Sequence, residues 1–142
     1  RTNFRYVTTE QIPEPIDFAS VDVSFISLRL ILPALLHLLK DGGQAVCLIK
    51  PQFEAGKDKI GKKGVVRDSS VHIEVIKTIC AFTIEIGFSI FKIDFSPIKG
   101  PEGNIEYLMY IKKTETHENL CEINVEDIVA SSHANLNGGE TL

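Results

Sequence analysis

The sequence predicts an α/β fold built on a largely parallel β-sheet. Segments with the pattern of strands alternate along the 142-residue chain with segments that have the pattern of helices, as in sheets whose strands are joined by helices. The apolar run 45–49 stands between Gly42-Gly43 and Pro51, and such a short run is typical of a strand buried on both faces. With 44% hydrophobic residues, the chain can form one domain with a single core.

The first predicted unit is a strand, a helix and a second strand. Residues 17–24 have the pattern of a strand, residues 28–40 that of a helix, and residues 44–50 that of the next strand. Pro33 is expected to break this helix or to start its regular part, because proline lacks the N–H that an interior helical position donates. Successive strands joined by one helix are commonly neighbours, so these two strands are predicted to pair in parallel.

A second helix and two more strands follow. Asp68 is a suitable N-cap, and Gly87 is well placed to end the helix. Residues 88–95 then alternate like a strand, and residues 105–111 form another strand after the Gly/Pro-rich turn 96–104. The apolar positions that recur at helical spacing are Val71, Val75, Ile79 and Ile86.

Lys50 is the strongest candidate for a functional residue, because it ends the apolar strand and lysine is rarely buried without a carboxylate or ligand beside it. Ligands of open α/β sheets bind at the carboxyl ends of the strands, where Asp22 also falls. Neighbouring strands are about 4.8 Å apart, so the two groups could form an ion pair. Glu106 could face the same crevice if its strand is antiparallel. From spacing alone, a turn cap for Asp22 and an exposed carboxylate for Glu106 are the simpler alternatives.

The basic charge of the chain is local. The chain has a formal net charge of -4, yet residues 50–67 hold six basic residues against two acidic ones, which leaves a net charge of -8 elsewhere. Glycines in this segment would let the main chain approach a phosphate backbone closely. A solvated flexible loop is the alternative that composition leaves open.

Several classes of site and location are not indicated. The three cysteines are odd in number and widely spaced, so neither a disulfide framework nor a zinc site is predicted, and Cys47 and Cys80 are most simply core thiols. None of the four histidines has metal-ligand spacing, and we assign them no role. No apolar stretch approaches the roughly 18 to 20 residues of a membrane span, so we expect a soluble cytoplasmic protein.

The last part of the chain has a different composition. Residues 114–142 contain six acidic residues and neither Lys nor Arg, which is typical of an acidic tail. Asn124 or Asp127 could cap a short helix within it, with Ile123 and Ile128 as a hydrophobic staple. We expect this helix to dock on the surface.

Four segments of the chain closely resemble the hemolysin A-like (TlyA) family of ribosomal RNA methyltransferases, in the same order. The resemblance runs from about residue 1 to residue 113, which is the predicted catalytic part. The segments are VDVSFISL (21–28), LIKPQFEAG (48–56), GVVRD (64–68) and GNIEY (103–107).

This resemblance implies a fold, a cofactor and roles for residues. The family is similar in its catalytic part to FtsJ-type RNA 2'-O-methyltransferases, which carry a Lys-Asp-Lys-Glu tetrad on a class I S-adenosylmethionine-dependent, Rossmann-like sheet. It implies that Asp22, Lys50 and Glu106 are the second, third and fourth members of the tetrad, and that Asp22, Ser24 and Phe25 bind the cofactor. The basic residues expected to contact phosphates of ribosomal RNA are Lys57, Lys59, Lys62, Lys63 and Arg67.

The implied reaction explains the residue types. A ribose 2'-hydroxyl must lose its proton when it accepts a methyl group, so a positioned base has to stand nearby. Lys50 can accept this proton if burial and a second cation make it neutral; if it stays charged, it can orient the oxygen and stabilise developing negative charge. Asp22 would lie against the cofactor, and Glu106 would orient Lys50 or the ribose.

The resemblance also predicts what the chain lacks. The family's first tetrad lysine, glycine-rich cofactor loop and S4-like RNA-binding domain lie upstream of the matched segments. We therefore expect this chain to hold the C-terminal half of the methyltransferase domain, as an inactive fragment of a longer enzyme. The strand at 17–24 would then have an unpaired edge, through which copies of the chain could associate.

Two other classes of function remain as alternatives. A noncatalytic RNA-binding module would use the same basic loop but would not need Asp22 or Glu106. A membrane-lytic protein is suggested by the hemolysin name, although the sequence has no long basic amphipathic helix to support it.

Overall fold

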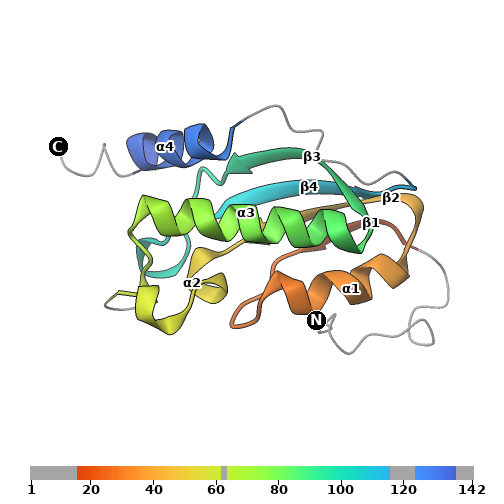
Figure 1. The fold of residues 1–142 in the computed structure, drawn as a ribbon, viewed down its shortest axis with the longest axis horizontal. Coiled ribbons are helices and arrows are strands. Elements are labelled where there is room, and N and C mark those ends of the chain that lie inside the picture. Colours follow the sequence, from red (N-terminus) through yellow and green to blue (C-terminus); the bar gives the residue numbers. More distant parts are fainter. Residues whose placement is uncertain (1–15, 62–63, 116–123, 137–142) are drawn as a thin grey trace.

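The computed structural model describes residues 16–61, 64–115 and 124–136 as one sheet with helices packed against it (Figure 1). Short 3₁₀ turns lie at Lys57–Lys59 and Pro101–Gly103. The strands are β1 (Ile16–Val21), β2 (Leu39–Ile49), β3 (Phe88–Phe95) and β4 (Tyr107–Lys113). The helices are α1 (Leu28–Leu38), α2 (Pro51–Glu54), α3 (Ser69–Ile86) and α4 (Val125–Leu136).

The sheet is mixed, with the strand order β1-β2-β4-β3. β1 pairs with β2 in parallel, as predicted for two strands joined by one helix, and Val21 lies opposite Cys47. β4 is antiparallel to both β2 and β3, so three strands run in one direction and β4 runs in the other. The predicted α/β class is confirmed, and the antiparallel β4 is the condition on which Glu106 was expected to face the crevice.

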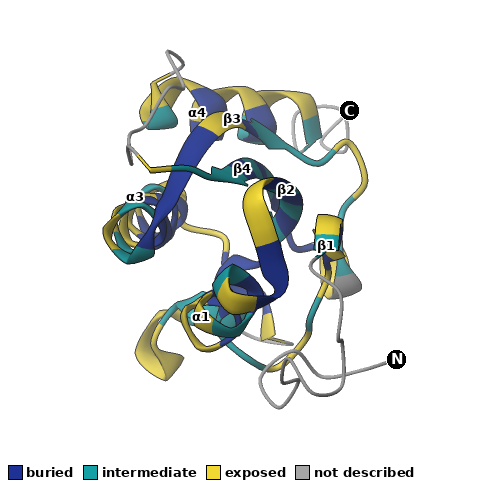
Figure 2. Ribbon diagram, turned by 90° about the vertical axis from the view of Figure 1, so that its right-hand side faces the viewer, coloured by how far each residue is buried: buried dark blue, intermediate teal, exposed yellow. Residues whose placement is uncertain are grey.

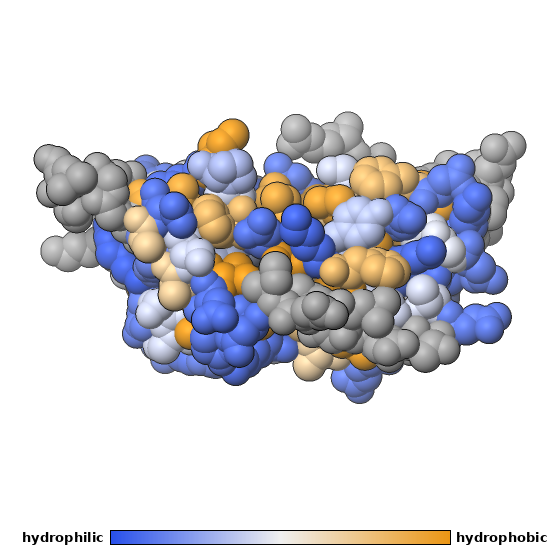
Figure 3. Space-filling model, turned by 90° about the horizontal axis from the view of Figure 1, so that it is seen from above, coloured by the Kyte–Doolittle hydropathy of each residue, from blue (hydrophilic) through white to orange (hydrophobic). Residues whose placement is uncertain are grey.

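The helices α1 and α3 contact each other and cover one face of the sheet (Figures 1 and 2). Ala45, Cys47 and Ile49 of β2 are fully buried on this face, whereas Val46 and Leu48 between them are only half-buried. The prediction that this strand is buried on both faces is therefore wrong for one of them. On the side seen from above, Figure 3 shows apolar side chains lying between hydrophilic ones.

Pro33 does not interrupt α1, contrary to the expectation. The helix runs through it from Leu28 to Leu38, and its N-cap Ser27 accepts a hydrogen bond of 3.0 Å from the backbone N–H of Arg29. Ile31, Leu32 and Leu35 are completely buried against the core. Burial of each such side chain contributes roughly 1.5–3 kcal/mol, which outweighs the single hydrogen bond that proline omits.

The predicted ends of α3 are confirmed. The Asp68 carboxylate accepts a hydrogen bond of 2.9 Å from the backbone N–H of Ser70, and so caps the first turn. Gly87 ends the helix with φ of 133°, a left-handed conformation that glycine adopts without strain. β3 follows at once with the predicted bounds 88–95.

The C-terminal helix α4 packs against α3 and β3 as part of the domain (Figure 1). Asn124 is its cap, since the side-chain oxygen accepts a hydrogen bond of 2.8 Å from the N–H of Glu126. Ile128 and Val129 are 4% and 1% exposed and join the same core as the sheet. Ile123, the other half of the predicted staple, lies outside the described residues.

A buried polar network joins α4 to the rest of the fold, through two histidines to which we assigned no role from the sequence. The Nε2 atom of His72 lies 2.8 Å from the carbonyl of Val66, which can only accept, so Nε2 carries the proton of the neutral ring. Nδ1 of His72 then accepts, and both the Tyr107 hydroxyl and Nε2 of His133 lie 3.0 Å from it. The Tyr107 hydroxyl also lies 2.8 Å from Ser132 on α4.

This network predicts that the chain loses stability in mild acid. Burial lowers the pKa of both His72 and His133, while Asp68 acts in the opposite direction on each. Below about pH 6.5, where a histidine of the unfolded chain gains a proton, the unfolded state therefore binds more protons than the folded state, and the free energy of unfolding falls with falling pH. Urea denaturation at pH 7.5 and 5.5 measures this fall.

The control for this prediction is a histidine outside the network. A His133→Gln variant should lose part of the pH dependence, whereas His37→Gln, which removes an exposed histidine on α1, should keep all of it. Equal pH dependence in the parent and in His133→Gln would contradict the prediction.

Candidate active site at the carboxyl end of the sheet

Asp22 and Lys50 meet where two parallel strands end. Asp22 directly follows β1 and Lys50 directly follows β2. The Lys50 ammonium forms an ion pair with the Asp22 carboxylate and donates a hydrogen bond of 3.3 Å to the hydroxyl of Ser24. Lys50 is only 8% exposed, whereas the side chain of Asp22 is 62% exposed. The expected ion pair is confirmed, and its carboxylate remains accessible from outside.

The chain reverses sharply after Lys50, which keeps this lysine at the end of its strand. Lys50 is the N-cap of α2, and Pro51 occupies the first helical position, where its missing N–H costs nothing. The Lys50 carbonyl accepts a hydrogen bond of 2.9 Å from Phe53 N. The backbone of Lys50 is thus held by its own segment, while its side chain is held by the loop after β1.

Glu106 enters β4 at the same end of the sheet. The pairing of β2 with β4 ends with Ile49 opposite Tyr107, so Lys50 and Glu106 occupy the next positions on the two neighbouring strands. Glu106 is 7% exposed, and its Oε2 accepts a hydrogen bond of 3.0 Å from Nε2 of Gln52. Among the described residues, Lys50 is paired with Asp22 and Glu106 with Gln52.

The turn between β3 and β4 is built around two residues that the sequence did not single out. Asn104 is 2% exposed; its Oδ1 accepts from the N–H of Val66 at 3.0 Å, and its Nδ2 donates to the carbonyl of Gly64 at 3.1 Å. A Cβ added to Gly100 would lie 2.1 Å from Oε2 of Glu106. The signal for both was their place in the Gly/Pro-rich turn just before a charged strand entry.

Ser24 and Phe25 lie in the loop beside Asp22. Phe25 has φ of 65°, which is rare and strained for a residue with a bulky side chain. Its ring is 89% exposed, and its centre is 4.8 Å from that of the Phe53 ring. Strained backbone of this kind clusters at active sites and ligand clamps.

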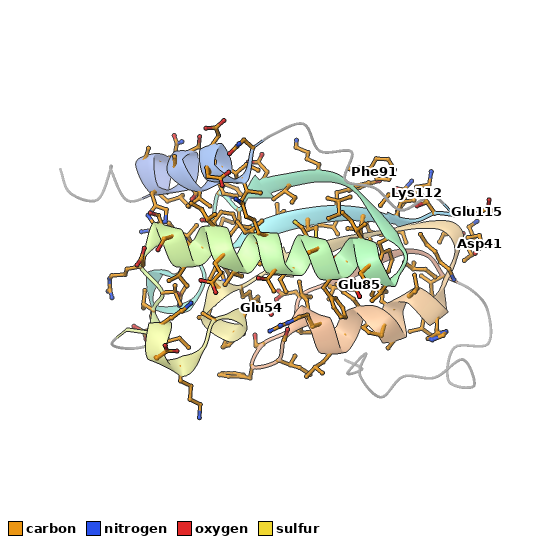
Figure 4. The ribbon with its side chains drawn as sticks, in the orientation of Figure 1. Asp41, Glu54, Glu85, Phe91, Lys112 and Glu115 are labelled. Carbon is orange, nitrogen blue, oxygen red and sulfur yellow. The ribbon has the colours of Figure 1, made fainter. Side chains whose placement is uncertain are left out.

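Glu54 joins this loop to α2 and was also missed. Its two oxygens accept hydrogen bonds from the Ser27 hydroxyl (2.5 Å) and from Leu28 N (2.8 Å), and burial raises the pKa of its carboxyl. Figure 4 shows Glu54 toward the end of the sheet opposite to that of Asp41 and Lys112. The loop that carries Asp22 is therefore anchored to the segment that follows Lys50.

The predicted RNA-contacting residues are placed only in part. Lys57 and Arg67 are exposed, and Lys59 pairs with Glu74 of α3 at 2.8 Å. Lys62 and Lys63 lie outside the described residues. The hydrogen bonds of Asn104 hold the end of this basic loop, so Arg67 emerges directly beside the turn that covers Glu106.

Taken with the sheet order, these charged groups define a class of protein. A mixed sheet with an antiparallel strand between two strands of the opposite direction, and with acidic and basic side chains at its carboxyl end, fits the Rossmann-like fold of class I S-adenosylmethionine-dependent methyltransferases. The family model of the FtsJ-like methyltransferases matches residues 1–113. The chain belongs to this family.

Individual relatives agree with this assignment. YqxC of Bacillus subtilis, named provisionally as an rRNA methyltransferase, is 45% identical over an alignment of 143 positions, which covers 96% of this chain and 50% of YqxC. The 16S/23S rRNA (cytidine-2'-O)-methyltransferase TlyA of Mycobacterium tuberculosis is 37% identical over 91% of this chain and 48% of its own length. The chain thus spans about half the length of the curated relatives it matches.

A solved structure matches almost the whole chain. It is that of a Streptococcus thermophilus protein named provisionally as a hemolysin, which is 48% identical with a TM-score of 0.93 and covers 99% of this chain and 51% of its own. Within the described parts of the present chain, no helix has the length and apolar character needed to cross a membrane.

Proposed function

We propose that the full-length protein containing this chain transfers a methyl group from S-adenosylmethionine to a ribose 2'-hydroxyl of ribosomal RNA. The observation that carries the proposal is the buried ammonium of Lys50, held by Asp22 at the carboxyl end of the sheet one strand away from Glu106. Membership of the FtsJ-like family supports this chemistry. The name of the M. tuberculosis relative supports cytidine as the nucleotide.

The residues around Asp22 fit the cofactor. S-adenosylmethionine has a positively charged sulfonium and a flat adenine, and it supplies an electrophilic methyl group when bound. The accessible carboxylate of Asp22 can attract the cationic part, and the exposed ring of Phe25 can stack on a flat one. Ser24 fixes the loop between them through its hydrogen bond from Lys50.

The geometry of Lys50 supports direct contact with the reacting oxygen. An ammonium group has three donors, and two of them are directed to Asp22 and Ser24. The third remains for the 2'-oxygen of the ribose. In this position Lys50 orients the oxygen and stabilises the negative charge that develops as the hydroxyl loses its proton. Glu106, fixed by Gln52, lies on the other side of Lys50 and can hold the ribose.

The test is a transfer assay with labelled S-adenosylmethionine and ribosomal RNA, followed by alkaline hydrolysis. Alkali cleaves RNA through the free 2'-hydroxyl, so a 2'-O-methylated position resists cleavage and a base-methylated one does not. We expect label in an alkali-resistant dinucleotide. Tight RNA binding without transfer would favour the noncatalytic RNA-binding module instead.

The basic loop is proposed to hold RNA through its phosphates. Lys57→Ala and Arg67→Ala should each weaken RNA binding similarly for different sequences and lower the slope of log Kd against log salt by about 1, as expected for one lost phosphate contact. Lys112→Ala is the matched control, because this lysine lies at the far end of β4 (Figure 4). Filter binding at several salt concentrations measures the slopes; equal losses in all three variants would contradict the proposal.

The isolated 142-residue chain is proposed to be inactive and to self-associate. β1 pairs with β2 on one side, and among the described residues no strand pairs with its other side. An unpaired strand edge of this kind is a template for pairing with another chain. We expect light scattering to give a mass above 15.8 kDa, and calorimetry to give weak binding of S-adenosylmethionine; a monomer that binds the cofactor tightly would contradict both expectations.

A further inference from the structure

Gln52 lies two residues after Lys50, and only one end of its buried side chain is satisfied. It is 6% exposed, its Nε2 donates to Oε2 of Glu106, and its Oε1 has no hydrogen-bond partner among the described residues. The amide nitrogen is the donor of this pair, and the Glu106 oxygen accepts. A glutamine used for packing alone is expected to have both ends satisfied, because a buried acceptor without a donor is costly.

Gly100 encloses the same carboxylate oxygen from a second side. A Cβ on Gly100 would lie 2.1 Å from Oε2 and 2.6 Å from Cδ of Glu106, so the backbone there leaves no room for any side chain. The turn is fixed by a hydrogen bond of 2.8 Å from the N–H of Gly100 to the carbonyl of Asn104. Oε2 of Glu106 is therefore held by the hydrogen bond from Gln52 and by contact with the Gly100 backbone.

Gln52 also ties the position of Glu106 to that of Lys50. Gln52 and Lys50 are separated only by Pro51, whose ring restricts the backbone. The turn is closed by the hydrogen bond from Phe53 N to the Lys50 carbonyl. One short segment thus carries both the Lys50 ammonium and the hydrogen-bond partner of the Glu106 carboxylate.

We propose that Gln52 is a positioning residue that fixes the carboxylate of Glu106 toward the substrate ribose. The proposal rests on the proposed function, because it assigns the residue that orients one of the groups named there. Gln52 acts through Glu106 and not on the reacting atoms.

The test compares two glutamines of the full-length enzyme. Gln52→Leu keeps most of the side-chain volume and removes the donor to Glu106, so kcat is expected to fall about 10- to 100-fold, as displaced catalytic groups do, while KM for S-adenosylmethionine stays within about twofold. Gln44→Leu is the matched control. Gln44 lies in the middle of β2, six residues before Lys50, where it accepts from the Tyr110 hydroxyl, and its removal should leave kcat unchanged.

A double-mutant cycle separates positioning from a merely structural role. In a Glu106→Ala background, Gln52→Leu should cause no further loss of kcat, because the residue through which it acts is gone. Multiplying losses would overturn the proposal. If Gln52→Leu does not fold, Gly100→Ala provides a second arm, since its added methyl group must displace the same oxygen; a parent-like kcat in Gly100→Ala would also overturn it.

The outcomes distinguish this proposal from the one on which it rests. If Lys50→Ala and Glu106→Ala both methylate RNA at the parent rate, the proposed function fails. If both lose activity while Gln52→Leu keeps the parent kcat, the positioning proposal fails alone.

Discussion

Replacing Lys50 by alanine is expected to lower the kcat of methyl transfer by about 10²- to 10⁴-fold, the range for removal of a positioned proton-transfer group or of a donor to a developing oxyanion. Lys50 is the cation paired with Asp22 at the carboxyl end of the sheet, and its ammonium has one donor left for the ribose oxygen. The measurement is single-turnover transfer from labelled S-adenosylmethionine by the full-length enzyme.

Cofactor affinity and folding must be measured alongside the rate. The side chain of Asp22 is largely exposed, so its loss of a partner in Lys50→Ala should not prevent folding. Lys112→Ala again serves as the lysine control at the opposite end of the sheet. A Lys50→Ala enzyme that binds S-adenosylmethionine and methylates RNA as fast as the parent would falsify the assigned role.

Replacing Asn104 by alanine is expected to have the largest effect on stability. The change removes the acceptor of the buried Val66 N–H and the donor to the Gly64 carbonyl. A buried N–H left without a partner costs about 1–3 kcal/mol, and the second hydrogen bond adds to the loss. Urea denaturation followed by circular dichroism measures the free energy of unfolding.

The same variant should reduce RNA binding, because Asn104 holds the loop that carries Arg67. Asn135→Ala is the matched control, since Asn135 is an exposed residue of α4 whose side chain, among the described residues, bonds only to the Ser131 carbonyl one turn earlier. Its free energy of unfolding should change by less than about 0.5 kcal/mol. An equal fall in the free energy of unfolding for the two variants would show that the Asn104 hydrogen bonds stabilise the fold no more than an exposed one does.

Features that depend on neighbouring residues could be predicted from the sequence. Asp68 and Gly87 were correctly identified as the ends of α3, because a cap acts within one turn of the helix. Pro33 was misjudged because three buried side chains on the same helix outweigh its local effect. The half-buried face of β2 was missed because an apolar run does not show which of its faces a helix will cover.

The residues of the site also fall into some that the sequence could predict and others that it could not. Asp22 and Lys50 could be paired in advance, since residues that follow parallel neighbouring strands come together at one edge. The partnership of Gln52 with Glu106 spans 54 positions, and that of Asn104 with Val66 spans 38. Nothing in the spacing of these residues indicates which polar side chains meet, so their roles could be seen only in the folded chain.

The direction of β4 decides which end of a strand can supply the last acidic residue. The seven residues of β4 extend for about 24 Å at roughly 3.4 Å per residue, so in a parallel strand the residue before it would lie about that far from Lys50. Because the strand is reversed, a residue at its entrance reaches the crevice, and the connection from β3 needs to be only a short turn. In this turn, the backbone at Gly100 lies against the Glu106 carboxylate. Changes of length between residues 96 and 105 would therefore alter the shape of the crevice before they altered the sheet.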